Sequence, residues 1–351
     1  MLPLLIVLLA PGVDVDDPAT CTPCHQAIVG EWSESLHRQA HHSQDPIYAA
    51  LRSLRMRDEG PEVAGACAKC HTPRAPVGDV EGGLHGVSCA ACHGVQAVKA
   101  SGVGRDRFEA APPGVLLGPH DVAAGASPAH GTGPAPAHFA DGSTLCMACH
   151  EQLANPRGVG MCATGLEWQA GGQPACTHCH MPEVATPNGV ADTDGRHRDH
   201  RFFGHGMQAD NPAALTLAGR IVGDTLVLTA TNQSGHALPT GFPGRVVQIE
   251  LEGFDGAGRS VWRPTDVQGL ALRRAFFDAA GAPTMPHQAV KAGPDTRLVA
   301  GEARLIPVAV PSEVQRIEAW AVHLALPPPV ATRLGLPPLT PRLLGRTTIQ
   351  R

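Results

Sequence analysis

The sequence predicts an α+β protein, with a mostly helical and loop domain over residues 13–210 and an all-β, immunoglobulin-like sandwich over residues 211–351. Two observations predict this division. Five Cys-x-x-Cys-His motifs lie before residue 181, among segments rich in Gly and Pro, and none follows. Beyond residue 210, short stretches alternate apolar and polar residues, as half-buried strands do.

The composition indicates that side chains alone form too small a core. Phe, Trp and Tyr number 8, 4 and 1 among 351 residues, whereas Gly and Pro number 40 and 33. The length suits two domains, or one domain and a region packed around cofactors. Bulky apolar cofactors are therefore expected to supply the missing mass. The net charge of −5 is mild and indicates no nucleic-acid partner.

The five motifs are the attachment signal of c-type haem, in which two cysteines bond to the haem and the histidine ligates the iron. A lone Cys-x-x-Cys also fits a zinc half-site, a redox dithiol or a disulfide. Here a histidine follows all five pairs, a coincidence on the order of one in a million by chance. The predicted attachment residues are Cys21, Cys24 and His25; Cys67, Cys70 and His71; Cys89, Cys92 and His93; Cys146, Cys149 and His150; and Cys176, Cys179 and His180. The sequence thus predicts five covalently attached haem c groups, two of them on adjoining motifs and in close contact.

Ten of the eleven cysteines belong to these motifs, so no disulfide framework remains. Cys162 is left over, and we expect a buried thiol rather than a ligand.

The first twelve residues form a short apolar run that predicts a secretory signal peptide, with Ala10 and Gly12 at the cleavage site. The run lacks Lys and Arg, and an uncleaved anchor is the alternative. No later segment is expected to cross a membrane. Export agrees with covalent haem attachment, which is completed outside the cytoplasm, so a periplasmic or otherwise exported protein is expected.

Other histidines are candidates for the second axial position of each iron. A helix from Glu31 to His42 would place His37 and His41 on one face, and we favour His37, with His41 and His42 as alternatives. His85 lies in the loop before the third motif, where a surface role is equally open.

Three later candidates also lie in segments without a predicted strand or helix. His130 is favoured over His120 and His138 in the loop before the fourth motif. His200 is favoured in the run that also holds His197 and His205, where neighbouring Arg residues suit haem propionates. His236 lies in the segment 232–245, which interrupts two predicted strands, and the alternative is an exposed loop histidine.

Alternation predicts strands in the C-terminal domain. Val247, Ile249 and Leu251 face one way along the stretch 245–253. Gly-Asp at 223–224 and Asp-Gly at 255–256 predict hairpin turns. Further strands are expected over 303–310 and 316–326. The basic C-terminal tail is either a weakly cationic docking segment or, as we favour, a solvated end.

The first 210 residues resemble the cytochromes c of the cytochrome c554 type, which are related to the hydroxylamine-oxidoreductase group of multihaem cytochromes. The matching runs are CTPCH with EWSESLH, GVSCAACHG, LCMACHE, LEWQAGG with CTHCHMP, and HRDHRFFGH. The resemblance implies a multihaem cytochrome c domain with stacked haem pairs, and it places distal ligands at His37, His130 and His200. Runs similar to SGHALPTGFP occur in sandwich domains appended to such cytochromes, which favours His236.

The resulting hypothesis is an exported pentahaem cytochrome that passes electrons between an electron-donor and an electron-acceptor protein. The first alternative is an oxidoreductase in which one haem iron lacks a distal ligand and acts on a small nitrogen compound or peroxide. The second is a subunit of an extracellular haem filament. We expect a carrier more than a catalyst, because 14 histidines outside the motifs are ample for five distal positions.

Overall fold

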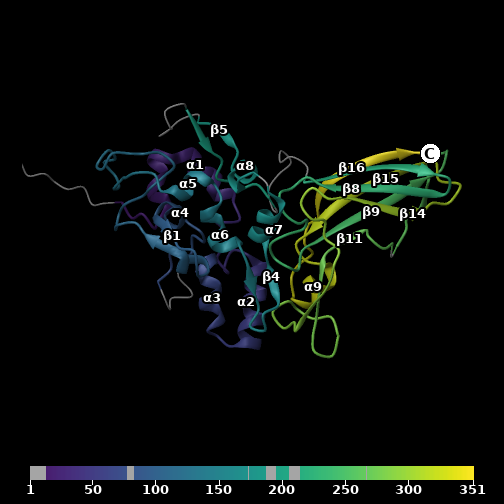
Figure 1. Cartoon of the computed structure of the whole chain (residues 1–351), viewed down its shortest axis with the longest axis horizontal. Coiled ribbons are helices and arrows are strands. Elements are labelled where there is room, and N and C mark those ends of the chain that lie inside the picture. Colours follow the sequence, from purple (N-terminus) through teal and green to yellow (C-terminus); the bar gives the residue numbers. More distant parts are fainter. Residues whose placement is uncertain (1–12, 77–82, 173, 187–194, 205–213, 266) are drawn as a thin grey trace, which may run out of the picture. The chain divides into compact units, whose positions relative to one another are not determined.

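The computed structural model describes residues 13–76, 83–172, 174–186, 195–204, 214–265 and 267–351. The predicted signal peptide and His205 lie outside these residues. The chain forms two compact units, residues 1–149 with 175–203 and residues 150–174 with 204–351. Residues 150–174, expected in the first domain, thus group with the second unit. Helices and antiparallel sheets together make the chain α+β, as predicted (Figure 1).

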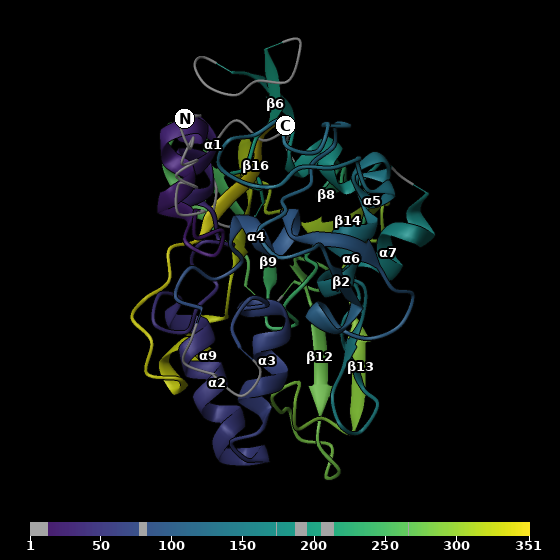
Figure 2. The ribbon, with the colours of Figure 1, turned by 90° about the vertical axis from the view of Figure 1, so that its left-hand side faces the viewer.

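The first unit consists of short helices and loops with two small hairpins. Its elements are the 3-10 helices η1 (Pro18–Cys21) and η2 (Gly104–Arg107), the helices α1 (Thr22–Glu34), α2 (Pro46–Glu59), α3 (Val63–His71), α4 (Cys89–His93), α5 (Ala137–Asp141), α6 (Thr144–His150) and α8 (Cys176–His180), and the strand pairs β1 (Val95–Val98) with β2 (Phe108–Ala110) and β5 (Glu183–Ala185) with β6 (Arg196–Arg198). Helix α6 ends at His150, one residue beyond this unit. Helices α2 and α3 lie side by side (Figure 2).

Local sequence explains where the first helices begin and end. Asp45 caps α2, because its carboxylate accepts hydrogen bonds from the backbone N–H groups of Ile47 and Tyr48. Helix α1 ends at Glu34, so the prediction of a helix from Glu31 to His42 is wrong beyond Glu34. Ser35 is extended, and its hydroxyl accepts a hydrogen bond from the backbone N–H of Arg38 at 3.1 Å, which competes with helix continuation.

The second unit holds two larger antiparallel sheets. The first has the order β10 (Ser260–Trp262), β9 (Val246–Phe254), β15 (Arg316–Leu324), β16 (Arg342–Gln350), with β11 (Ala271–Leu272) also on β9. The second has the order β14 (Ala303–Ala309), β8 (Thr225–Asn232), β7 (Leu215–Val222). Two pairs, β3 (Leu153–Ala154) with β4 (Gly160–Cys162) and β12 (Arg274–Phe277) with β13 (Lys291–Asp295), and the helices α7 (Thr164–Gly171) and α9 (Pro328–Arg333) complete it.

The predicted strands and turns of this unit are confirmed. Gly223 and Asp224 join β7 to β8, and Asp255 and Gly256 follow β9. Alternate residues of β8 and β15 are buried. The buried faces of both sheets contribute to one apolar cluster, with Leu228, Ile306 and Ile317 among its members. Period-two burial thus builds the core of the second unit.

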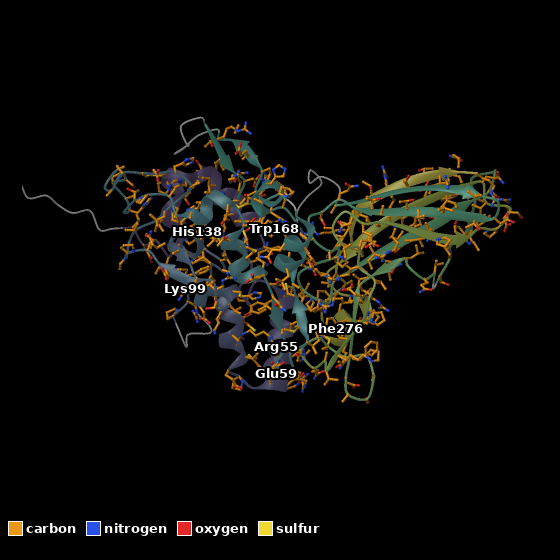
Figure 3. The ribbon with its side chains drawn as sticks, viewed as in Figure 1. Arg55, Glu59, Lys99, His138, Trp168 and Phe276 are labelled. Carbon is orange, nitrogen blue, oxygen red and sulfur yellow. The ribbon has the colours of Figure 1, made fainter. Side chains whose placement is uncertain are left out.

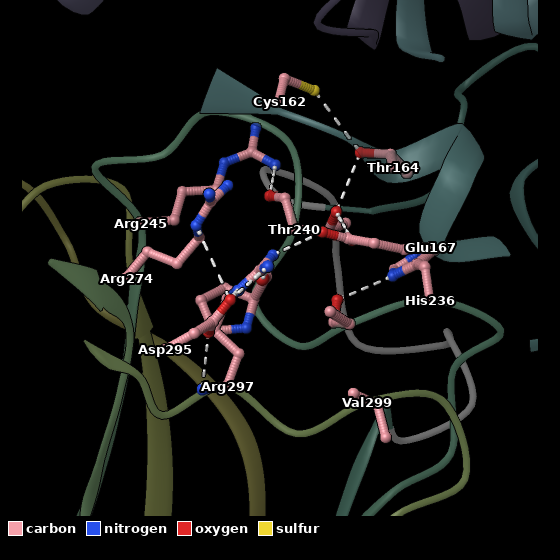
Figure 4. Close-up of polar contacts among 12 residues, drawn as sticks. Cys162, Thr164, Glu167, His236, Thr240, Arg245, Arg274, Asp295, Arg297 and Val299 are labelled. Atoms are coloured by element: carbon pink, nitrogen blue, oxygen red, sulfur yellow. Dashed lines mark hydrogen bonds and ion pairs between the residues drawn. The ribbon is translucent and has the colours of Figure 1, made fainter. Parts of the chain in front are cut away.

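The loop 233–245 is braced by hydrogen bonds within the second unit (Figure 4). The buried Asn232 amide donates to the carbonyl oxygens of His236 at 2.8 Å and of Leu298 and Val299 at 3.0 Å. Its side-chain oxygen accepts from Ser234. A single buried amide therefore fixes the start of the loop that carries His236.

The middle of the same loop is held by Glu167 of α7 and by Arg297. Thr240 donates its hydroxyl hydrogen to the Glu167 carboxylate at 2.5 Å. Arg297 donates to that carboxylate at 2.7 Å and to the carbonyl oxygen of Pro239 at 3.2 Å. Charge-assisted hydrogen bonds of this kind are among the stronger ones, so the loop is anchored at its start and in its middle.

The alternation on β14 gives a matched pair of variants. Ile306 is 2% exposed in the core cluster, whereas the adjacent Leu305 is 64% exposed. Ile306→Ala is expected to lower the free energy of unfolding by about 2–5 kcal/mol, because it leaves a cavity. Leu305→Ala should change it by less than about 0.5 kcal/mol. Urea unfolding followed by circular dichroism measures both, and equal losses would contradict the burial pattern.

A second prediction concerns the loop 233–245. Asn232→Ala removes a buried amide that donates to the carbonyl oxygens of His236, Leu298 and Val299, so a loss of about 1–3 kcal/mol of unfolding free energy is expected. The neighbouring Gln233→Ala is the control, because its amide donates to the Thr216 hydroxyl at the surface. The same urea titration checks it, and an unchanged midpoint for Asn232→Ala would refute the bracing role.

Candidate haem-binding site

Each motif occupies about one helical turn. The second and fourth motifs end α3 and α6, the third and fifth are α4 and α8, and Cys21 caps α1 while Cys24 and His25 lie in its first turn. Side chains three and four residues apart lie on one face of a helix. In the second to fifth motifs both thiols and the imidazole therefore lie on the same side, as attachment of one haem requires. In the first motif, His25 departs from helical geometry, with a φ of −121° and a ψ of 36°.

The cysteines of different motifs lie within hydrogen-bonding reach of one another in the first unit. Side-chain hydrogen bonds join Cys21 to Cys89, Cys70 to Cys149 and Cys146 to Cys176. The bond from Cys89 lowers the pKa of Cys21 to about 7, and the bond from Cys146 lowers the pKa of Cys176 to about 6. These bonds link the first motif to the third, and the second, fourth and fifth motifs to one another.

Three motif histidines have their tautomer set by a backbone carbonyl. The Nδ1 of His71 donates to the Ala40 oxygen at 3.1 Å, the Nδ1 of His93 to the Leu117 oxygen at 2.7 Å, and the Nδ1 of His180 to the Phe203 oxygen. A carbonyl oxygen only accepts, so Nδ1 carries the proton and Nε2 carries the lone pair. This is the arrangement of metal-ligating histidines.

Burial keeps several of these imidazoles neutral. It is the largest cause that lowers the pKa of His25, His71 and His93. The nearby His130 imidazole lowers the pKa of His25 further. Neutral imidazole is the form that binds a metal, so the donor set fits haem iron.

Three of the five predicted distal ligands have the same tautomer. The Nδ1 of His130 lies 2.8 Å from the Gly131 oxygen, that of His200 lies 2.6 Å from the Arg198 oxygen, and that of His236 lies 3.0 Å from the Ala237 oxygen. Burial, with the nearby His93, also lowers the pKa of His200 to about 4. In each of these three side chains Nε2 therefore carries the lone pair that a metal ligand needs.

His37 and His85 have different surroundings. The His37 ring meets the Phe202 ring edge to face, with centroids 4.2 Å apart. The His85 side chain is 41% exposed, and its Nε2 lies 3.9 Å from a carboxylate oxygen of Asp17. His85 is thus placed for a surface ion pair, which was the alternative left open by the sequence.

Two other histidines have the tautomer that does not suit ligation through Nε2. The Nδ1 of His41 accepts from the backbone N–H of Ser43 at 3.1 Å, so the proton of the neutral ring is on Nε2. The Nε2 of His197 lies 2.9 and 3.0 Å from the carboxylate oxygens of Glu31. These contacts favour His37 over His41, and His200 over His197.

His138, which the sequence ranked below His130, is a further candidate (Figure 3). It lies on α5, is 5% exposed, and its Nε2 has no hydrogen-bond partner in the part of the chain that the structure describes. A buried imidazole nitrogen without a partner is costly unless it meets a ligand or an ion. His138 is therefore a further candidate for an iron ligand. His138 and His130 lie in the same Gly- and Pro-rich segment, which has no periodic pattern, so the sequence alone does not distinguish them.

The leftover cysteine is separate from the motifs. Cys162 lies on β4 in the second unit and is partly buried, with Sγ 3.7 Å from the Thr164 hydroxyl. Its surroundings agree with the expected thiol.

The comparisons with known proteins point to the same chemistry. Residues 20–94 match the family model described as cytochrome c554 and c-prime. A penta-haem cytochrome c552 from Thermochromatium tepidum has a similar fold, with a TM-score of 0.75 and 23% identity over 94% of this chain and 97% of that one. No curated protein matches the chain. The expected resemblance to the cytochromes of the c554 type is therefore confirmed for residues 20–94, and the chain shares the fold of a penta-haem cytochrome c.

Proposed function

We propose that this protein is an exported electron carrier with five covalently attached haem c groups, one on each motif. Bound haem supplies an iron that alternates between the ferric and ferrous states. The observation that carries the proposal is the contact between the cysteines of different motifs in the first unit. Attachment points so close together favour closely spaced haems, which suit fast electron exchange.

The proposed attachment residues are the ten motif cysteines, with His25, His71, His93, His150 and His180 as proximal ligands. The proposed distal ligands are His37, His85, His130, His200 and His236, and their tautomers support His130, His200 and His236 most directly. His138 is a further candidate, because its buried Nε2 has no described partner.

The second unit is proposed to be an immunoglobulin-like sandwich. The shared apolar cluster of its two larger sheets supports this architecture. Its role in the proposal is to hold the His236 loop rigid. The basic tail with Arg342 and Arg346 includes β16, which pairs with β15.

Export to the periplasm or a similar compartment is proposed for two reasons. Covalent haem attachment occurs there, and the sequence of residues 1–12 has the pattern of a signal peptide. None of the described helices is long and apolar enough to cross a bilayer. The proposed partners are an electron donor and an electron acceptor.

One observation favours the catalytic alternative. His85 is exposed and lies beside Asp17, so a haem that relied on it would have no distal ligand. An open iron would accept a small nitrogen compound or peroxide.

Haem counting tests the proposal. The holoprotein is expected to hold five haems by pyridine haemochrome, and Cys67→Ala combined with Cys70→Ala should leave four. Cys162→Ala is the matched control and should retain five, because Cys162 lies outside the motifs. A native count below five would refute the proposed cofactor content.

The spin state of the same sample separates the carrier from the enzyme. A carrier with saturated irons should give only low-spin ferric signals by electron paramagnetic resonance. A high-spin signal that shifts on addition of nitrite, hydroxylamine or cyanide would favour the enzyme.

A further inference from the structure

A hollow in the second unit is lined by three arginines. Arg245, Arg274 and Arg297 share its wall with residues 239–243 and Met161, all of them in this one unit. Its empty space is about 220 Å³, counting the open mouth. No Asp or Glu is among the described residues that line it. A wall with three guanidinium groups and no described carboxylate attracts an anion.

Two carboxylates hold Arg297 in place without lining the hollow (Figure 4). Asp295 accepts hydrogen bonds from Arg297 Nε at 2.9 Å and from Nη2 at 2.8 Å, and Glu167 accepts from Nη1 at 2.7 Å. Asp295 also lies 3.7 Å from Nε of Arg274. The Arg297 and Arg274 side chains are only 14% and 18% exposed. Their guanidinium groups are therefore fixed within the protein rather than spread into solvent.

Local contacts also fix Arg274 and Arg245. The guanidinium carbon of Arg274 lies 5.4 Å from the centre of the Phe276 ring. Arg245 donates from Nη1 to the carbonyl oxygen of Thr240 at 2.9 Å. Gly241 has a φ of 77°, and a Cβ at this position would lie 2.7 Å from Nη1 of Arg245, so a glycine is required beside the guanidinium. Side chains that are already ordered lose little freedom when a ligand binds.

The size of the hollow limits the ligand. Pockets for drug-sized molecules measure about 300–1,000 Å³, and this hollow is smaller. The planar guanidinium group matches the oxygens of carboxylates and phosphates through two parallel hydrogen bonds. The wall and its size therefore suit an anion of a few atoms that presents oxygens on its surface.

We propose that this hollow is a binding site for a small free oxyanion of the size of sulfate, bound by the guanidinium groups of Arg245, Arg274 and Arg297. The site goes beyond electron transfer. It does not rest on the proposed function, because no motif residue is among the described residues of its wall.

Titration calorimetry of the holoprotein with sodium sulfate tests the site, with the ionic strength held constant by sodium chloride. Sulfate is expected to bind at a single site per chain. Arg274→Gln should weaken this binding by about tenfold or more, because a charge-assisted hydrogen bond is lost. Arg273→Gln is the matched control, because it removes the same charge from the adjacent, exposed residue and should leave the affinity unchanged. Equal weakening in both variants, or no binding to the native holoprotein, would overturn the proposal.

A second variant covers a failure of Arg274→Gln to fold, which circular dichroism detects. Arg245→Gln should weaken sulfate binding to a similar degree, and an unchanged affinity would overturn the proposal. A redox titration of the same variants identifies another source of oxygen anions, the propionates of a haem. A shifted haem potential in Arg274→Gln, with no sulfate binding to the native protein, would assign the hollow to a propionate and overturn the site for a free oxyanion.

Discussion

The first unit depends on one constraint, which is that an imidazole can offer Nε2 to a metal only if its proton is held on Nδ1. Backbone carbonyl oxygens meet this need for His71, His93 and His180, and for the distal candidates His130 and His200. The carbonyls of Ala40, Leu117 and Gly131 come from segments between the motifs, and those of Arg198 and Phe203 come from the segment after the fifth motif. These segments therefore contribute to the candidate site by holding the histidine rings.

The interiors of the two units are built from different kinds of buried residue. Both apolar clusters found in the described ranges belong to the second unit. The buried apolar residues of the first unit are mostly small, among them Ala64, Ala68, Ala90, Ala91 and Ala148. Small side chains beside the motifs leave little apolar mass of their own, which agrees with a unit that folds around porphyrin.

Sequence reasoning succeeded where the structure is periodic or local. The strand over 246–254 and the turn at Gly223 follow from alternation and turn chemistry. The prediction was wrong at the end of α1, because the Ser35 hydroxyl accepts a hydrogen bond from the backbone N–H of Arg38, and this bond competes with continuation of the helix. It also missed the placement of residues 150–174, because Asn155 donates to the carbonyl oxygens of Pro286 and Ala289, more than 130 residues away. Contacts at such separation leave no periodic signal in a single sequence.

The segment 197–203 shows how one stretch serves two positions of the site. His200 is a distal candidate, while the carbonyl oxygen of Phe203 takes the Nδ1 proton of the motif residue His180. Asp199, fully buried, accepts from Arg201 at 3.0 Å and donates its backbone N–H to the Pro182 oxygen. Phe202 has a φ of 54°, an unusual conformation for a bulky residue, and it contacts the rings of both His37 and His200. These contacts hold the His200 backbone and the Phe203 carbonyl oxygen, which meets His180, on one braced segment.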